Sequence, residues 1–217
     1  MAERGHKLVR YADDWIILKK SLKSAQNIME KAKIYLEEEL KLKVHPKKTK
    51  LVDARHEAFE FLGFYFKLVN DRNGPNIKAI FGPSYKSIKK FKEKVKEITR
   101  RNQTTSAEVV IAELNKKLTG WGNYFGIGYV KRLFEKLDGW MRRRIRMVQM
   151  RSWRTPNKLI AILEKKGIKG NFKRISMTAW KNSACQMAHL AMDLEWFNQR
   201  GWHGLIDVRN KLLSEKG

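Results

Sequence analysis

The chain has 217 residues, which is enough to bury one good core or two small ones. It carries 47 Lys and Arg against 22 Asp and Glu, and this formal charge of +25 favours a polyanionic partner. Aromatic residues at 11%, interleaved with basic ones, favour nucleic acid over an anionic membrane. No apolar run approaches the ~20 residues of a membrane span, the N-terminus does not read as a signal peptide, and the single Cys excludes an internal disulfide. We therefore expect an intracellular, cytoplasmic protein.

The first predicted element is a β-hairpin with two adjacent carboxylates, Asp13 and Asp14, at or beside its tip. Residues 7–10 and 15–18 are short runs rich in Val, Ile and Trp, as strands are. Adjacent Asp side chains repel each other in a folded sheet, so a cation must lie beside them. Mg²⁺ prefers oxygen ligands and often binds through one or two carboxylates plus phosphates. The pair therefore predicts a Mg²⁺ site, and the alternative is a solvated Asp-Asp turn.

An amphipathic helix follows, with Ser21 as its N-cap and an end near Leu40. Its apolar residues recur at helical spacing, and we expect them to pack as core against the sheet. This stripe comprises Leu22, Ala25, Met29, Ala32, Leu36 and Leu40. Residues 42–44 then predict a short strand that Pro46 closes.

Residues 58–69 are dense in Phe and Tyr and predict a strand, in which Gly63 indicates a bulge or a close backbone approach. Residues 71–74 predict a turn and residues 77–81 the return strand. Gly82-Pro83 interrupts the pattern, and we expect a domain boundary there.

Three helices are predicted next: from residue 84 to about 98, from Ser106 to Leu118, and from Tyr129 to about Trp153. Lysines occupy the outer faces of the first, and many of them are simply solvated, but a helix of one sign also suits a phosphate backbone. The third carries an Arg cluster that we expect on its outside, and no acid lies between residues 139 and 158. Because solvent-facing helices normally mix signs, these residues form the predicted nucleic-acid surface. The surface comprises Lys89, Lys90, Arg100, Arg101, Arg142, Arg143, Arg146, Arg151 and Arg154.

Residues 120–128 combine four glycines with three aromatic side chains. Glycine permits tight turns and close helix approach, so the segment predicts a structural corner between the second and third helices. A base-stacking platform is the alternative.

Four segments together resemble the group II intron reverse transcriptase/maturase family. Tyr11-Ala12-Asp13-Asp14 is similar to the YxDD box of reverse transcriptases. Residues 42–50 (LKVHPKKTK) and 59–64 (FEFLGF) resemble the following palm motif and the primer-grip strand. Residues 118–125 (LTGWGNYF) resemble the signature of the maturase-specific region, or domain X. The four segments occur in the order and spacing of the family.

The resemblance implies an α+β fold. A partial reverse-transcriptase palm of β-hairpin, helix and short strands would cover residues 1–82. A three-helix basic thumb/domain X would follow at 83–155, and a small helical region, in the place where the family carries DNA-binding residues, at 156–217. For that last region the residues predict a helix over 159–163 ending at Gly167, and another from Met187 that ends at Gly201. One Cys and scattered His residues argue against an appended zinc-supported nuclease domain.

The resemblance also implies site residues and partners. Asp13, helped by Asp14, would hold two Mg²⁺ ions, and Lys48 would lie near the departing pyrophosphate. Phe61, Leu62, Gly63 and Phe64 would form the primer grip. The implied partners are structured intron RNA, an RNA–DNA primer-template, dNTP and target DNA.

A palm also needs an earlier strand with another carboxylate, and fingers, which the resemblance places upstream of the hairpin. We therefore expect an RNA-directed DNA polymerase/maturase whose isolated chain is catalytically incomplete and whose fingers/palm half belongs to a longer protein or to a partner chain. Two alternatives stay open: a non-catalytic RNA-binding module, and a decayed truncated reading frame.

Overall fold

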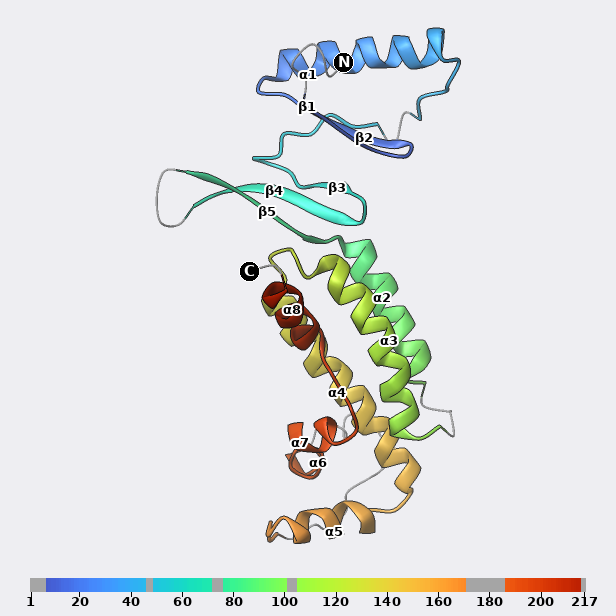
Figure 1. Ribbon diagram of the computed structural model, residues 1–217, viewed down its shortest axis with the longest axis vertical. Helices are drawn as coiled ribbons and strands as arrows, with labels where there is room; N and C mark the ends of the chain where they lie inside the picture. The colour runs from blue at the N-terminus through green and yellow to red at the C-terminus, as the bar shows by residue number, and fades with distance from the viewer. Residues whose placement is uncertain (1–6, 46–48, 72–75, 101–104, 171–185, 216–217) are drawn as a thin grey trace. The chain divides into compact units, whose positions relative to one another are not determined.

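The computed structural model describes residues 7–45, 49–71, 76–100, 105–170 and 186–215 (Figure 1). The chain divides into two compact units, Met1–Ser84 and Tyr85–Gly217, which we call the hairpin unit and the helical unit. Small antiparallel sheets in the first and helices in the second confirm the predicted α+β class. Among the described residues, no helix has the length and apolar character needed to cross a bilayer.

The hairpin unit begins with the predicted β-hairpin. Strands β1 (Lys7–Tyr11) and β2 (Asp14–Leu18) pair antiparallel, with Tyr11 opposite Asp14. A two-residue turn, Ala12-Asp13, joins them, and Ala12 has a φ of 52°. A positive φ at the first turn residue is typical of two-residue hairpins, because it matches the twist of the flanking strands.

Helix α1 (Leu22–Ile34) begins at Ser21, whose Oγ accepts from Ser24 N at 3.3 Å, as predicted. A π-helical segment, η2 (Tyr35–Glu39), continues it. The predicted buried stripe is wrong, since Ala32 is the one residue of α1 that is buried. Leu22, Met29 and Leu40 are exposed, so this face is not covered within the described residues.

Three strands complete the hairpin unit: β3 (Phe59–Phe61), β4 (Phe64–Asn70) and β5 (Ile77–Pro83) in the order β3-β4-β5. The predicted return strand is confirmed. Residues 42–44 form no strand, because the Leu42 N–H bonds to the Leu36 carbonyl instead of to a neighbouring strand. The sheet is held by stacked rings, with Phe66 centred 5.3 Å from Phe59 and 5.8 Å from Phe81.

The helical unit is built on α2 (Tyr85–Ile98), α3 (Ala107–Phe125) and α4 (Lys131–Trp153). The predicted N-cap Ser106 accepts from Val109 N at 3.5 Å. Helix α3 continues past the predicted end at Leu118, so the chain turns at residues 126–130 instead of at Gly120. The largest fully buried side chains of these helices are Ile111, Leu114, Leu118, Phe134, Met141, Ile145 and Met150.

The glycine-aromatic segment has a structural role, but residues 120–125 belong to α3 and only residues 126–128 lie in the turn. The Trp121 ring of α3 lies 4.3 Å from the Phe91 ring of α2 and 5.6 Å from the Phe134 ring of α4, so three helices share one aromatic cluster. Tyr124 and Tyr129 remain exposed. Of the three aromatic residues of the segment, Tyr124 is therefore the one left exposed for a base-stacking role.

The remaining helices are α5 (Asn157–Lys165), α6 (Gln186–Ala191), α7 (Leu194–Asn198) and α8 (Leu205–Ser214). Gly167 and Gly201, with φ of 71° and 69°, end helical segments as predicted. The single helix predicted from Met187 is instead α6 and α7. The division occurs because the Asp193 side chain accepts from Trp196 N and starts a new helix.

Residues 156–217, which the sequence analysis sets apart as a third region, belong to the same compact unit as α2–α4. Helix α8 lies alongside α3 and α4 (Figure 1). Both Asp138 oxygens accept from the first turn of α8, at 2.8 Å from Leu205 N and 3.1 Å from Ile206 N. Farther along, Arg200 Nε donates to Glu108 at 2.9 Å. The tail is thus fastened to the bundle at several places.

Candidate functional site

The two carboxylates of the predicted metal site lie at the tip of the β1–β2 hairpin. Asp13 is in the turn and Asp14 is the first residue of β2, and both are exposed. Arg10 Nε donates to the Ala12 carbonyl at 2.8 Å and so closes the turn beside them. Because successive side chains along a strand point to opposite faces of the sheet, the register of β2 fixes the face on which the Asp14 side chain lies.

Carboxylate oxygens at an open tip fit a hard divalent cation. Their number leaves most coordination positions to water, phosphate or other carboxylates, which also suits Mg²⁺. Within the described ranges, no group of three or more His, Cys, Asp or Glu side chains gathers at one place. The tip therefore brings two carboxylates together, without a third side chain of these types beside them among the described residues.

The predicted primer-grip residues form a second hairpin tip. Phe61 ends β3, Phe64 begins β4, and the turn between them is Leu62-Gly63 with φ of 49° and 77°. Gly63 therefore lies in a tight turn and not in a bulge within one strand. Its carbonyl accepts from Ser84 N at 2.7 Å, which fixes the turn to the end of β5. This sheet is separate from the two-stranded sheet that carries Asp13 and Asp14.

Two predicted site residues, Lys48 and Arg101, lie outside the described residues. Lys89, Lys90 and Arg100 are exposed on or beside α2, and Arg151 and Arg154 are exposed at the end of α4. These five side chains are thus available at the surface of the helical unit.

The Arg cluster of α4 divides into two groups. Arg142 and Arg143 are half-buried, whereas Arg146 is only 5% exposed. Arg146 Nε donates to the Met192 carbonyl at 3.0 Å, and its guanidinium lies 5.2 Å from the centre of the Phe197 ring. Burial, with the neighbouring Arg142 charge, lowers the pKa of Arg146 to about 10. The expected position of Arg146 on the outside is therefore wrong, because the α6–α7 segment covers it.

Three residues of this surface were not predicted from the sequence: Arg144, Trp140 and His189. Arg144 donates from Nε to Thr99 Oγ1 and, at 3.0 Å, to the Thr99 carbonyl, which ties α4 to the end of α2. Trp140 has Lys92 5.9 Å and Arg144 5.6 Å from its ring centre. Thr99 and Lys92 are more than forty residues away from these side chains in the sequence, so no local pattern indicates them, whereas Trp140 and Arg144 are an i, i+4 pair of one helix.

His189 of α6 is the third such residue. Burial, followed by the charges of Arg146, Arg142 and Arg143, lowers the pKa of His189. The three Arg side chains and His189 are therefore near neighbours. Positive charge is concentrated where α6 meets α4.

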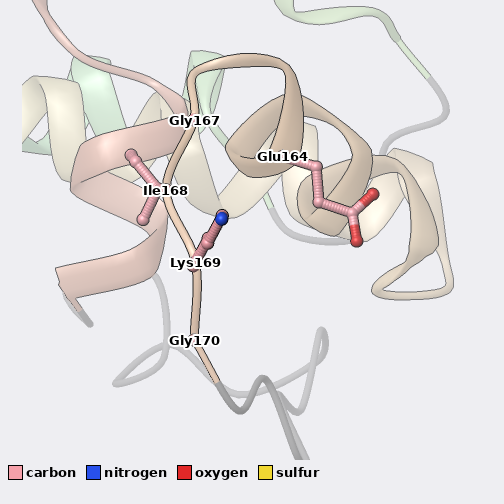
Figure 2. Close-up of a pocket in the computed structure, with 5 residues that line it drawn as sticks. All are labelled: Glu164, Gly167, Ile168, Lys169 and Gly170. Carbon is pink, nitrogen blue, oxygen red and sulfur yellow. The ribbon is translucent and has the colours of Figure 1, made fainter.

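A pocket of about 340 Å³ lies at the end of α5 (Figure 2). Glu164 projects from the helix, whereas Gly167, Ile168, Lys169 and Gly170 line it from the chain that follows. One carboxylate and one amine among mainly backbone atoms make no recognisable catalytic set, so we assign no chemistry to this pocket.

Two family models match the chain in succession. The reverse transcriptase (RNA-dependent DNA polymerase) model matches residues 1–66, and the group II intron, maturase-specific domain model matches residues 88–167. Together they cover more than half of the chain and follow the order expected from the four motifs. The chain belongs to the group II intron reverse transcriptase/maturase family. It corresponds to the C-terminal part of such a protein, whose parent activity is RNA-directed DNA polymerisation.

The maturase-specific match spans α2, α3, α4 and α5, the helices that carry the exposed basic residues. RNA binding and assistance to splicing fit this domain, and intron RNA and other nucleic acids are the substrates that the two domains imply. Divalent metals are general to the reverse transcriptase family. The chain has no match among the curated proteins with which it was compared.

Proposed function

We propose that the helical unit binds the structured RNA of a group II intron and assists its splicing, and that the hairpin unit supplies part of a polymerase active site. The observation that carries the proposal is the succession of the two family matches, with the acid-free Arg segment between residues 139 and 158 inside the second match. An unmixed positive surface suits RNA, because Lys and Arg side chains that contact its phosphates release the counterions condensed there.

In the complete active site, Asp13 and Asp14 would hold Mg²⁺ through their carboxylate oxygens. Two such ions, when bound, activate the primer 3′-OH and stabilise the leaving pyrophosphate of the dNTP. The family resemblance assigns Lys48 a role near that pyrophosphate. The turn of Phe61, Leu62, Gly63 and Phe64 positions the primer end of an RNA–DNA primer-template, and target DNA is a further substrate.

The hairpin tip offers two carboxylates, so we propose that a further carboxylate and the fingers come from a complementary fingers/palm half. Catalysis of phosphoryl transfer depends on positioning and charge stabilisation, so an incomplete ligand set should abolish it. A second function, RNA binding without catalysis, is favoured by the core that the helical unit forms by itself.

Primer extension on an RNA template with Mg²⁺ and labelled dNTP tests the catalytic part. We expect no extension by the 217-residue chain alone, and extension when the complementary half is added. Asp13→Asn should then reduce the rate by about 10³-fold or more, as loss of a metal ligand removes charge stabilisation in the transition state. Extension by the isolated chain that Asp13→Asn abolishes would refute the proposed incompleteness. RNA binding without extension under any of these conditions would leave only the second function.

The RNA-binding part is tested by the dependence of affinity on salt. Replacing Arg142 and Arg143 with Gln should flatten the slope of log K against log salt by about 1.4 to 1.8, which corresponds to two phosphate contacts. The matched control replaces Lys19 and Lys20, beside the catalytic hairpin, and should flatten it less. Equal slopes for the two double variants would mean that net charge, and not the helical unit, determines binding.

A further inference from the structure

The outer face of α4 carries a row of residues at helical spacing: Arg132, Lys136, Gly139 and Arg143. Residues four, three and four apart lie above one another on a helix. Arg132, Lys136 and Gly139 are exposed and Arg143 is half-buried. From Arg132 to Arg143 the row extends about 16 Å, since each residue adds ~1.5 Å. We call it the α4 track.

Gly139 in the middle of the track is not explained by packing within the chain. A Cβ added there would meet no atom within 4 Å. By contrast, a Cβ at Gly122 would lie 2.7 Å from Val208 Cγ1, so the approach of α8 requires that glycine. A glycine within a helix costs roughly 0.5–1 kcal/mol relative to alanine. Gly139 therefore leaves open space on a charged surface at a cost in stability.

One exposed carboxylate, Glu135, lies beside the track four residues before Gly139. Further positive charge borders the other side and the far end. Lys92 and Arg144 flank Trp140, the residue next to Gly139. At the far end, Arg142 and His189 lie beside Arg143. No acid follows Gly139 until after residue 158. A gap in side chains between cations admits the backbone of a polyanion, whereas a membrane would need apolar side chains on the same face.

We propose that the α4 track receives the sugar–phosphate backbone of RNA, with Arg132, Lys136 and Arg143 on phosphates and Gly139 permitting contact with the helix backbone itself. The inference rests on the proposed RNA binding and specifies its place. RNA is favoured over DNA because the maturase-specific match, at residues 88–167, contains the whole track. A duplex strand has a phosphate for roughly every 3.4 Å of axis, so the track spans several.

The test compares Gly139→Ala with Gly120→Ala in the full chain. Gly120 is also exposed within a helix, and a Cβ there would meet no atom within 4 Å. Its row, however, contains Glu113 and Asn123 and is not uniformly positive. Both changes should raise the thermal midpoint by roughly 1–4 °C, through helix propensity. Only Gly139→Ala should weaken binding of a fluorescein-labelled RNA duplex of about 20 base pairs, by about 3- to 10-fold in fluorescence anisotropy.

A second pair, Gly139→Glu and Gly120→Glu, adds one negative charge at either place. Gly139→Glu should lower RNA affinity by at least tenfold more than Gly120→Glu at low salt. If the two variants of each pair changed RNA affinity equally, while the wild-type chain still bound RNA, the proposed role of the track would be overturned and the proposed function would stand. Failure of the wild-type chain to bind the RNA would remove the proposed function itself. If the Gly139 variants lost affinity only for the same duplex made of DNA, or only for phosphatidylserine vesicles, RNA would be excluded as the partner of the track.

Discussion

The two units of this chain differ in what they bury. In the helical unit, Leu114, Phe134 and Ile145 are 0% exposed and belong to one continuous set of buried side chains. In the hairpin unit, Val9 and Leu18 are each 50% exposed, although they lie in paired strands. Stability follows from the apolar area removed from water, so the helical unit carries most of it. Exposed apolar surface of the kind on the hairpin unit is typical of sites that contact another protein segment.

The largest expected effect comes from truncating one aromatic side chain in each unit. Phe134→Ala should lower the free energy of unfolding by about 3–5 kcal/mol, because it leaves a cavity in a fully packed core. Trp15→Ala, at a position 37% exposed, should lower it by less than about 1 kcal/mol. Urea unfolding followed by circular dichroism measures both. Similar losses would mean that the hairpin unit is packed as tightly as the helical unit.

Local sequence signals determined the elements of both units well. Ser21 and Ser106 mark helix starts because a side-chain oxygen is needed there, and Gly167 and Gly201 mark ends because the backbone adopts a positive φ. Such signals lie within one turn of the residues they affect, so a single sequence contains them.

Contacts between distant segments were not predictable in the same way. Arg146 has the composition of a surface residue, and only the Met192 carbonyl and the Phe197 ring, some fifty residues later, explain its burial. The stripe of α1 shows the opposite case, since helical spacing indicates a face to be covered but not whether the chain covers it. At the hairpin tip, the sequence indicated the ligand type of Asp13 and Asp14, but not their exposure.

The second effect concerns a carboxylate in each unit. Asp138→Ala should cost about 2–3 kcal/mol, because it leaves the Leu205 and Ile206 N–H groups buried without their acceptor. Asp13→Ala, at the exposed hairpin tip, should change stability by no more than about 0.5 kcal/mol. Chemical unfolding of the two variants measures the difference. An equal cost would contradict the view that the polar groups of the hairpin tip are free for ligands.

A smaller effect tests whether α8 belongs to the helical unit in solution. Gly122→Ala should destabilise the protein by about 1–2 kcal/mol, because the added methyl group would lie 2.7 Å from Val208 Cγ1. Gly120→Ala, two residues away with open space, should stabilise it by up to about 1 kcal/mol. Thermal melts compare the pair. If both changes stabilise equally, α8 does not pack on α3, and residues 156–217 form the separable region that the sequence indicated.

The smallest effect concerns the charge of the helical unit and not its core. Burial, followed by the charges of Arg146, Arg142 and Arg143, lowers the pKa of His189, because each disfavours a positive charge on the imidazole. Arg142→Gln removes one of these charges and should therefore raise the pKa of His189 toward the usual range. An NMR titration of the imidazole C–H signals measures the shift.

Arg132→Gln on the same helix is the matched control. It lies ten residues, or about 15 Å, farther along α4, beyond the ~8 Å screening length of physiological salt, and should leave the titration unchanged. Equal shifts for the two variants would show that His189 senses the total charge of the chain, and the concentration of positive charge at the α4–α6 junction would then be excluded.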